Sequence, residues 1–307
     1  MYNIPFSNLN KKTLVIVDAN AFVYSSFYGC SEKLDIKGQD HRVLHGLLNV
    51  LVKLTYELDK IDYLFLIFDP DDGHLFRESQ YPSYKRNRPP IDTDLIRQRN
   101  AAKIIFKERL GIPIVHYSGY EADDIIGSLA KIASKYYQVI IVSHDKDIAQ
   151  LVDDNIFLLR SRHTKNQKGY VLMDESVVKK EFGVYPKQIP DWLALMGDSS
   201  DNLPGLENIG EKTAAKILSL YPSIEHLLSI AHCLDDKKLK EKILAARDNL
   251  LLVKKLATIV TDLPIAELVN EAIKYSNLVR NSPTYKEDLL RLEKYFNWKS
   301  YYKEMFL

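Results

Sequence analysis

The sequence predicts an α/β fold: a parallel sheet with helices on both faces, followed by a mostly helical region. Over the first half of the chain, short apolar runs that suit buried strands alternate with segments whose apolar residues recur at helical spacing. This alternation is typical of parallel sheets whose connecting helices cover both faces. From about Asp174 onward the pattern is mostly helical, with Gly and Pro residues between short helices. The change of pattern indicates a second, helical unit.

In the first half, five short apolar runs bounded by polar or turn-forming residues are predicted to be strands. They lie at residues 14–17, 64–68, 113–116, 139–142 and 156–159. Longer periodic segments between them are predicted to be helices, at residues 43–58, 94–110 and 121–133. Gly111 and Pro113 end the second of these helices.

In the second half, Gly and Pro residues are expected to separate short helices. The expected breaks are Gly183, Pro186, Pro190, residues 202–210 and Pro222. The final segment, residues 286–307, is rich in aromatic residues and is expected to form a helix that packs back onto the body.

The composition is ordinary for a soluble globular protein, with 46% hydrophobic and 27% charged residues in 307. Its two cysteines, Cys30 and Cys233, lack the spacing of a zinc site or disulfide framework and fit a reducing compartment. No run approaches the roughly 20 apolar residues that span a bilayer. We therefore expect a cytoplasmic protein without membrane association.

The formal net charge of +1 does not by itself indicate a nucleic-acid partner. Basic residues nevertheless gather in stretches at residues 77–99, 160–168 and 237–255. Together with acidic clusters elsewhere, such stretches suit a polyanionic substrate. The last stretch fits a solvated helix face equally well.

Nine acidic residues occur at five places where a strand ends or a helix begins. They are Asp18, Asp69, Glu121, Asp123, Asp124, Asp145, Asp147, Asp198 and Asp201. Carboxyl ends of parallel strands open into one crevice, where repelling carboxylates would be stabilised by divalent cations such as Mg²⁺ or Mn²⁺. Acidic residues are also common in the first turn of helices, which is the simpler interpretation of Glu121 alone. Asp198 and Asp201, at i and i+3, are expected on one helical face.

A carboxylate crevice of this kind predicts phosphodiester hydrolysis with two metal ions. Two ions about 4 Å apart can bind both the attacking and the leaving oxygen at phosphorus, and they lower the pKa of a bound water. No histidine in the sequence pairs convincingly with a nucleophilic serine or cysteine.

Residues 77–90 follow Asp69 and interleave basic residues with tyrosines. Such a segment can contact phosphates and stack on bases, and a lysine in it can stabilise charge in the transition state. A solvated, flexible loop is the alternative, given its prolines.

Residues 203–213 contain two glycines before a helix. A Walker A loop is excluded, because Glu211 follows Gly210 where that motif requires lysine. We favour a helix-hairpin-helix whose backbone amides approach a DNA phosphate without sequence preference. A tight turn between helices with a glycine cap is the alternative.

Six short motifs occur in the order found in the 5′ nuclease family. They are Val-Asp at 17–18, Phe-Asp at 68–69, Gly-Tyr-Glu-Ala-Asp-Asp at 119–124, Asp-Lys-Asp at 145–147, Gly-Asp-Ser-Ser-Asp-Asn-Leu-Pro-Gly at 197–205 and Ile-Gly-Glu-Lys-Thr-Ala at 209–214. From about Thr13 to the C-terminal aromatic segment, the chain resembles this family, which includes flap endonucleases. It is most similar to the 5′-3′ exonuclease domain at the N-terminus of bacterial DNA polymerase I.

The resemblance implies a PIN-like nuclease core at residues 1–185, with a helical arch at about 77–99. It also implies a helical DNA-binding region at 186–307, with a helix-hairpin-helix at about 191–222 and C-terminal helices packed back on the core. In the family, the carboxylates matching the nine acidic residues hold two Mg²⁺ ions, and a K⁺ ion often binds at the helix-hairpin-helix. The implied substrates are DNA with 5′ flaps, 5′ ends, nicks or RNA primers, cleaved by a monomer during replication and repair.

The residues matching Lys85 and Arg77 assist at the scissile phosphate in the family, and Asp124 and Asp145 are expected to be essential for cleavage. The residues expected to contact DNA are Tyr84, Arg86, Arg88, Gly205, Gly210, Lys212 and Thr213. Three positions depart from the usual family pattern: Ala19 replaces a glycine, His144 replaces a small residue beside Asp145, and residues 38–46 lack a Thr-Asn step.

Two other functions fit parts of the sequence pattern. A non-catalytic DNA-binding module could retain the fold, but it would gain nothing from repelling acids. A phosphatase or phospho-receiver with an aspartyl nucleophile would need a second aspartate two residues after Asp18, where Asn20 stands. No polymerase sequence follows Leu307, so nucleotide addition is not predicted.

Overall fold

The computed structural model describes residues 11–32, 38–70, 76–164 and 167–280. Across these residues, six strands form one sheet in the order β3-β2-β1-β4-β5-β6. Their bounds are β1 Thr13–Asp18, β2 Tyr63–Ile67, β3 Ile114–Val115, β4 Gln138–Val142, β5 Ile156–Thr164 and β6 Gln167–Met173. Neighbouring strands run parallel except β6, which pairs antiparallel with β5. All five predicted strands are confirmed.

The sixth strand was not predicted. Residues 160–168, which include the end of β5 and the start of β6, are rich in basic and polar side chains. They lack the apolar run by which the other strands were predicted. The sheet is therefore mostly, and not wholly, parallel. An antiparallel edge strand on a parallel sheet is common in large α/β folds.

Alternate residues of β1 enter two separate hydrophobic cores. Leu14 and Ile16 pack in one core and Val15 and Val17 in the other, because successive side chains of a strand point to opposite faces. This central strand is buried along its whole length, since helices cover both faces of the sheet. The predicted covering of both faces is confirmed.

One face is covered by α1 (Ala19–Gly29), α2 (Arg42–Glu57) and α4 (Thr93–Ile104), which contact one another. A π-helical turn, η1 (Ile105–Arg109), continues α4 up to Gly111, in agreement with the predicted helix. The other face carries α5 (Ala122–Ala133), and α12 (Ala266–Arg280) packs against α5 and β3. The helix α1 was not predicted. Tyr24 and Tyr28 are exposed on its outer face, so its hydrophobic residues do not recur at a clear helical spacing.

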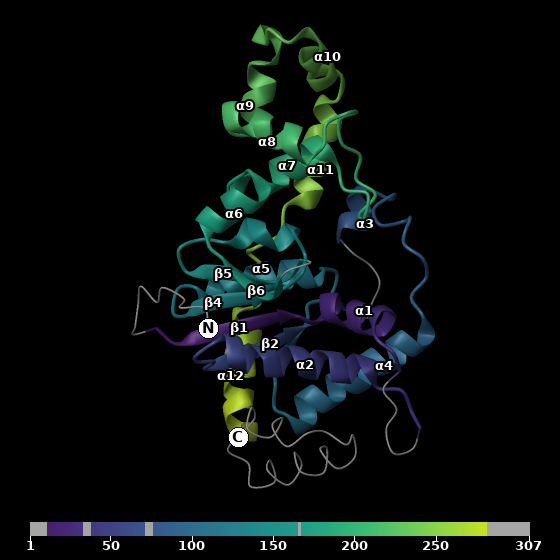
Figure 1. Cartoon of the computed structure of the whole chain (residues 1–307), viewed down its shortest axis with the longest axis vertical. Helices are drawn as coiled ribbons and strands as arrows, with labels where there is room; N and C mark the ends of the chain where they lie inside the picture. The colour runs from purple at the N-terminus through teal and green to yellow at the C-terminus, as the bar shows by residue number, and fades with distance from the viewer. Residues whose placement is uncertain (1–10, 33–37, 71–75, 165–166, 281–307) are drawn as a thin grey trace.

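The helical region stands above the sheet body in Figure 1. It contains α6 (Glu175–Phe182), α7 (Ile189–Met196), α8 (Glu211–Leu220), α9 (Ile224–Ser229), α10 (Lys237–Ala245) and α11 (Arg247–Ala257). Shorter helical turns are η2 (Asp147–Leu151), η3 (Pro186–Gln188) and η4 (Ala231–Cys233), and α3 (Phe76–Gln80) lies beside the junction with the body. The mostly helical second half is confirmed. The predicted aromatic helix at 286–307 lies outside the described residues.

The expected arch at about 77–99 is not one continuous helix. The short α3 is followed by turns at residues 82–87, and α4 begins only at Thr93. Pro82, Pro89 and Pro90 interrupt helical hydrogen bonding in this segment. Within the described part of the chain, no helix is both long and apolar enough to cross a bilayer.

Candidate active site

Three of the five acidic places meet at the carboxyl edge of the sheet. Asp18 ends β1, Asp69 lies two residues beyond β2, and Asp145 lies three residues beyond β4. These three strands are adjacent and parallel, so their carboxyl ends open on the same side. Glu121 caps the N-terminus of α5, and Ala122 there donates its backbone N–H to Asp69 Oδ1 at 2.9 Å. The strand ends that carry these carboxylates therefore lie side by side, as the sequence predicts.

The acidic side chains at this edge repel one another. Burial raises the pKa of Asp18 to about 7, and the charges of Asp145 and Asp69 add to the effect. Burial also raises the pKa of Asp123 well above its usual value, again with the charges of Asp145 and Asp18. Burial and the charge of Glu121 raise the pKa of Asp69 as well. We call Asp18, Asp69, Glu121, Asp123 and Asp145 the first acidic cluster.

Ser143 fixes two members of this cluster. Its hydroxyl donates to Asp18 Oδ2 at 2.6 Å and accepts from the backbone N–H of Asp145 at 3.0 Å. Asp18 also caps α1 by accepting from the backbone N–H of Ala21 at 3.2 Å. The two carboxylates are therefore held by hydrogen bonds that do not involve a basic side chain.

A second acidic cluster consists of Asp145, Asp147, Asp198 and Asp201. Burial raises the pKa of Asp147 to about 7, with the charges of Asp145, Asp198 and Asp201 acting in the same direction. Lys146 Nζ lies 2.6 Å from Asp198 Oδ2 and 3.3 Å from Asp147 Oδ1. Burial alone would raise the pKa of Asp198, but hydrogen bonds from Lys146 and Ser200 lower it below its usual value. Asp145 interacts with both clusters.

Asp198 and Asp201 do not lie on a helical face, so that expectation was wrong. Gly197 ends α7 with φ of 78°, and residues 199–202 form a turn closed by paired backbone hydrogen bonds between Asp198 and Leu203 at 2.8 Å. The Asp198 carboxylate accepts from the backbone N–H of Ser200 at 2.8 Å, which stabilises the turn against a helix.

Arg77 and Asp124 are buried against each other. Arg77 Nη1 and Nη2 donate to Asp124 Oδ2 and Oδ1 at 2.6 and 2.8 Å, and Nη1 also donates to Glu121 at 3.0 Å. Asp124 is 0% exposed and further accepts from the backbone N–H of Val260 at 2.9 Å. The expectation that both side chains face the substrate is not met. The reason is that Asp124, in the first turn of α5, pairs with Arg77 of α3.

The segment 83–88 is docked on the turn 199–202. Lys85 Nζ forms an ion pair with Glu121 Oε1 and lies 3.7 Å from Asp201 Oδ2. Burial alone would lower the pKa of Lys85, but the charges of Glu121 and Asp201 raise it, so the ammonium stays protonated. Arg88 Nη2 pairs with Asp201 Oδ1 at 2.7 Å. Basic side chains of this segment thus neutralise part of the acidic crevice.

Tyr84 was expected to stack on DNA, but it is 4% exposed. Its hydroxyl lies 2.9 Å from both Glu121 Oε2 and Asp201 Oδ2. The alternation of side chains around the turn buries Tyr84 and leaves Arg86 exposed. Arg86 remains available at the surface.

The two glycines of the predicted phosphate-binding loop, residues 203–213, lie in different surroundings. Gly205 is packed against Gly197, so that a Cβ on Gly205 would lie 2.2 Å from the Gly197 nitrogen. Gly205 is therefore required by the loop itself. At Gly210, by contrast, a Cβ would meet no atom within 4 Å, and Lys212 and Thr213 are exposed in the first turn of α8.

Two residues missed by the sequence reasoning are Tyr24 and Tyr28. They are 36% and 64% exposed on α1 and stack on each other, with ring centroids 6.4 Å apart. Burial and the charge of Asp69 raise the pKa of Tyr24. The i, i+4 spacing of two tyrosines six residues after Asp18 was the available signal.

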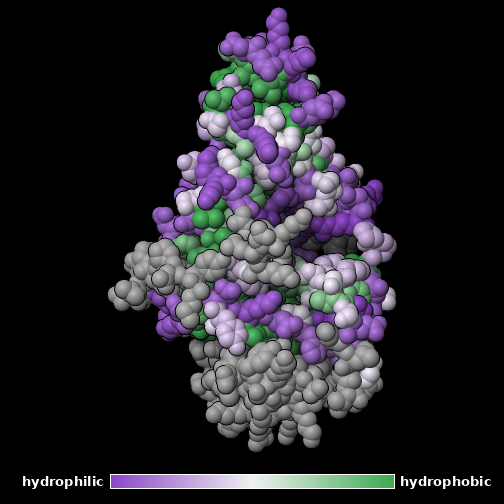
Figure 2. All heavy atoms as spheres, viewed as in Figure 1, coloured by the Kyte–Doolittle hydropathy of each residue, from purple (hydrophilic) through white to green (hydrophobic). Residues whose placement is uncertain are grey.

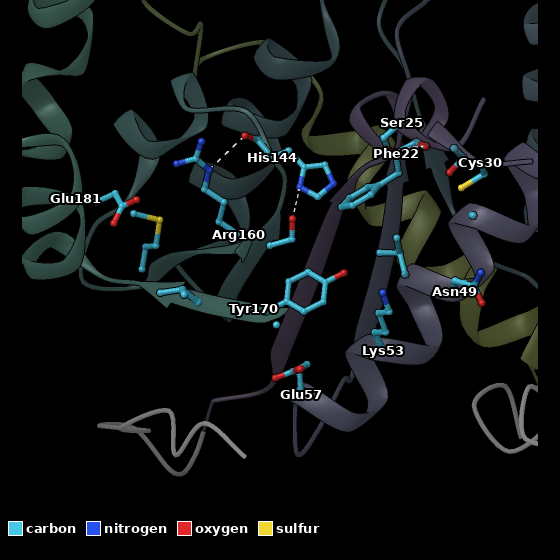
Figure 3. Close-up of a pocket in the computed structure, with 17 residues that line it drawn as sticks. Phe22, Ser25, Cys30, Asn49, Lys53, Glu57, His144, Arg160, Tyr170 and Glu181 are labelled. Carbon is cyan, nitrogen blue, oxygen red and sulfur yellow. Dashed lines mark hydrogen bonds between the residues drawn. The ribbon is translucent and has the colours of Figure 1, made fainter. Parts of the chain in front are cut away.

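His144 does not crowd Asp145. Its ring packs edge-on against Phe22 at a centroid distance of 4.4 Å, and Nδ1 lies 2.8 Å from Ser161 Oγ. Figure 3 shows this ring on the wall of a separate pocket between α1, α2 and the β5–β6 hairpin, with a volume of about 1060 Å³. Arg160 and Tyr170 line the same pocket.

Among the described residues, no three His, Cys, Asp or Glu side chains already surround a point in the way that holds a metal ion. The chemistry of the donors nevertheless fits a divalent cation. Buried carboxylate oxygens with raised pKa values are hard ligands whose mutual repulsion a cation relieves.

A family model described as "5′-3′ exonuclease, N-terminal resolvase-like domain" matches residues 13–183, and one described as "5′-3′ exonuclease, C-terminal SAM fold" matches residues 184–280. The 5′-3′ exonuclease of Aquifex aeolicus is 39% identical over 264 residues, which cover 86% of each chain. DNA polymerase I of Caldicellulosiruptor bescii is 37% identical over 257 residues, covering 82% of this chain and 29% of that protein. The chain thus spans under a third of this longer relative.

A solved structure of T5 5′-exonuclease with bound divalent metal ions (zinc) superposes with a TM-score of 0.68 at 19% identity, covering 87% of this chain and 99% of that one. The catalytic core of Rad2 in complex with DNA substrate gives a TM-score of 0.52 at 15% identity, covering 92% of each chain. At these identities the likeness shows the fold.

Proposed function

The chain belongs to the 5′-3′ exonuclease family, and from this premise we propose that it is a structure-specific 5′ nuclease. It hydrolyses phosphodiester bonds of 5′ flaps, 5′ ends and RNA primers in DNA, during replication and repair. The observation that carries the proposal is the convergence of two clusters of repelling carboxylates at one edge of the sheet. Carboxylates whose mutual repulsion raises their pKa values are expected where cations and a polyanion bind.

We propose that two Mg²⁺ or Mn²⁺ ions bind here. Asp18, Asp69, Glu121, Asp123 and Asp145 would hold one, and Asp145, Asp147, Asp198 and Asp201 the other. When bound, such ions supply a hydroxide-like water near neutral pH and neutralise charge on the phosphate. Asp124 is not included, because Arg77 and the backbone N–H of Val260 occupy its oxygens.

Lys85 is proposed to contact the reacting phosphate. It cannot serve as a base, because its raised pKa keeps it charged. In the structure the Lys85 ammonium pairs with the Glu121 carboxylate. When DNA binds, the ammonium would pair with a phosphate in place of this carboxylate. A cation positioned where charge develops stabilises the transition state. Arg86 and Arg88, on the same segment, are proposed to contact the DNA backbone.

Tyr24 and Tyr28 are proposed to form a stacking surface for the terminal bases. Base–aromatic stacking tolerates any sequence, which suits an enzyme that recognises the shape of a DNA end. Tyr24 lies beside Asp69, so a stacked base would place its phosphate at the acidic edge.

Duplex DNA is proposed to bind at the helix-hairpin-helix. The open backbone at Gly210 and the exposed Lys212 and Thr213 begin α8, where backbone N–H groups and the helix dipole favour a phosphate. Figure 2 shows a largely hydrophilic surface over this upper region. A K⁺ ion is proposed to help hold the phosphate there.

We infer a division into a nuclease core at residues 1–185 and a DNA-binding region at 186–307. The meeting of the two family matches at residues 183 and 184 supports this boundary. We also propose that the protein acts as a cytoplasmic monomer.

Cleavage of a 5′-labelled flap substrate with Mg²⁺, and its loss on chelation, is the direct test. The matched control is Asp145→Asn, which should bind the flap and leave it intact. The second candidate is a non-catalytic DNA-binding module, and retained binding with no cleavage by the wild-type protein would favour it. Its weakness is that the unpaired acids at the sheet edge would then serve no purpose.

A further inference from the structure

Asn20 is a buried side chain without a partner. It is 8% exposed, and among the described residues neither its Nδ2 nor its Oδ1 has a hydrogen-bond partner. Burying a carboxamide without hydrogen bonds destabilises a fold, and such groups are rare in native proteins. Asparagine also has a low helix propensity, yet Asn20 stands inside the first turn of α1. The residue therefore weakens the fold at this position.

The position of Asn20 on α1 places it at the acidic edge. Residues four apart lie on one side of a helix, so Asn20, Tyr24 and Tyr28 form one stripe. The helix α1 follows directly on β1 and contacts β2, so this stripe begins at the edge of the sheet where Asp18 emerges. Phe22, on a different side of the helix, contacts His144 beyond β4.

Asn20 also lies one turn nearer to the sheet edge than Tyr24. Asp18, two residues before it, both ends β1 and caps α1. Along α1, Asn20 therefore lies between Asp18 of the first acidic cluster and the exposed tyrosine stack. A nucleotide whose base stacks on Tyr24 would pass its sugar and phosphate over this position.

We propose that Asn20 is a substrate-contact residue whose carboxamide binds the reacting end of the DNA strand. The Nδ2–H donates to a phosphate oxygen beside the scissile bond, and Oδ1 accepts from a hydroxyl group or water on the same nucleotide. This role rests on the proposed nuclease function. It explains why an amide with both a donor and an acceptor is kept where an alanine would stabilise the helix.

Asn20→Ala tests the proposal with two readouts that move in opposite directions. The thermal unfolding midpoint should stay the same or rise, because an unsatisfied group is removed and helix propensity improves. The single-turnover cleavage rate of a 5′ flap with Mg²⁺ should fall about a hundred- to a thousand-fold, as for the loss of one donor in an active site. A structural asparagine would give the reverse pattern.

Two further variants sharpen the test. Asn20→Ser keeps a shorter donor and acceptor and should recover part of the rate, whereas Asn20→Asp keeps only acceptors and should not. Asn155→Ala is the matched control, because Asn155 Oδ1 accepts from Lys11 at 2.9 Å near the start of β5, away from the acidic edge. It should lower the midpoint and leave the rate unchanged.

An unchanged cleavage rate in Asn20→Ala, or a lowered midpoint without a rate change, would overturn the role of Asn20 while the nuclease function stands. Absence of metal-dependent cleavage in the wild-type protein would overturn both.

Discussion

Arg77 and Asp124 form a two-point ion pair that joins α3 to α5 inside the protein, with nitrogen–oxygen distances of 2.6 and 2.8 Å. The same guanidinium donates from Nε to the carbonyl of Leu256 at 2.7 Å and from Nη2 to that of Thr258 at 3.0 Å. One side chain thus connects the segment that leads to Lys85, the helix that carries Glu121 and Asp123, and the chain that leaves α11. The pair therefore holds together the segments that carry Lys85, Glu121 and Asp123.

We expect Arg77→Ala and Asp124→Ala each to destabilise the protein by about 3–5 kcal/mol, because each leaves an uncompensated buried charge. Urea unfolding followed by circular dichroism measures the change. The double variant Arg77→Met with Asp124→Leu should recover much of the stability, since apolar residues of similar size can replace a buried pair. Equal stability of Asp124→Ala and wild type would show that this carboxylate is free, as a metal ligand would be.

Asp145→Asn, in contrast, should not destabilise the protein. The charge of Asp145 contributes to the raised pKa values of Asp18, Asp123 and Asp147, so its removal relieves repulsion in both clusters. In chelator, the variant should unfold at the same or a higher temperature than wild type, while flap cleavage with Mg²⁺ is lost and flap binding is kept. A lowered unfolding temperature would indicate that Asp145 is structural.

The contrast between these two aspartates shows what the sequence does and does not contain. Strand ends predicted the crevice, because an apolar run followed by Asp18 or Asp69 fixes where the carboxylate emerges. The direction in which Asp124 points depends on Arg77, 47 residues earlier in the chain, and no local pattern encodes that pairing. In the same way, Tyr84 was predicted as a DNA contact from its neighbours, while its burial depends on Asp201 in a distant turn.

Lys85→Ala should lower the single-turnover rate of flap cleavage by about a hundred- to a thousand-fold, the usual effect of removing one charge-stabilising donor. The variant should stay folded, because Glu121 keeps its hydrogen bonds from Arg77 and Tyr84, and its unfolding temperature checks this. Lys135→Ala, at an exposed lysine beyond the C-terminal end of α5, is the control and should leave the rate unchanged. A Lys85→Ala protein that cleaves at the wild-type rate would remove this residue from the reaction.

Stability without metal should fall as the pH rises from about 4 to 7, the interval between the usual pKa of an aspartate and the raised values here. The pKa of Asp18 and that of Asp147 are both raised from 3.8 to about 7, so the folded state binds more protons than the unfolded state in this interval. The stabilising effect of protonation is complete below the lower value and is lost as the pH passes the upper one. Thermal unfolding in chelator at pH 5 and pH 8 measures it.

Divalent metal should restore the stability that is lost at high pH in chelator. At pH 8, added Mn²⁺ should raise the unfolding temperature of wild type and have a smaller effect on Asp145→Asn. A wild-type midpoint that rises between pH 5 and pH 8 in chelator would mean that the clusters are not strained by repulsion.

Gly205 and Gly210 provide a matched pair in one loop. A Cβ on Gly205 would lie 2.2 Å from both the Gly197 nitrogen and the Met196 carbonyl carbon, so Gly205→Ala must displace backbone and should destabilise the turn that presents Asp198 and Asp201. At Gly210 a Cβ has open space, so Gly210→Ala should leave the unfolding temperature unchanged. If the start of α8 binds a DNA phosphate, the added methyl group should weaken duplex binding several-fold, measured by fluorescence anisotropy in chelator. Unchanged binding by a stably folded Gly210→Ala protein would place the duplex elsewhere, whereas weakened binding with unchanged folding would locate it at this helix end.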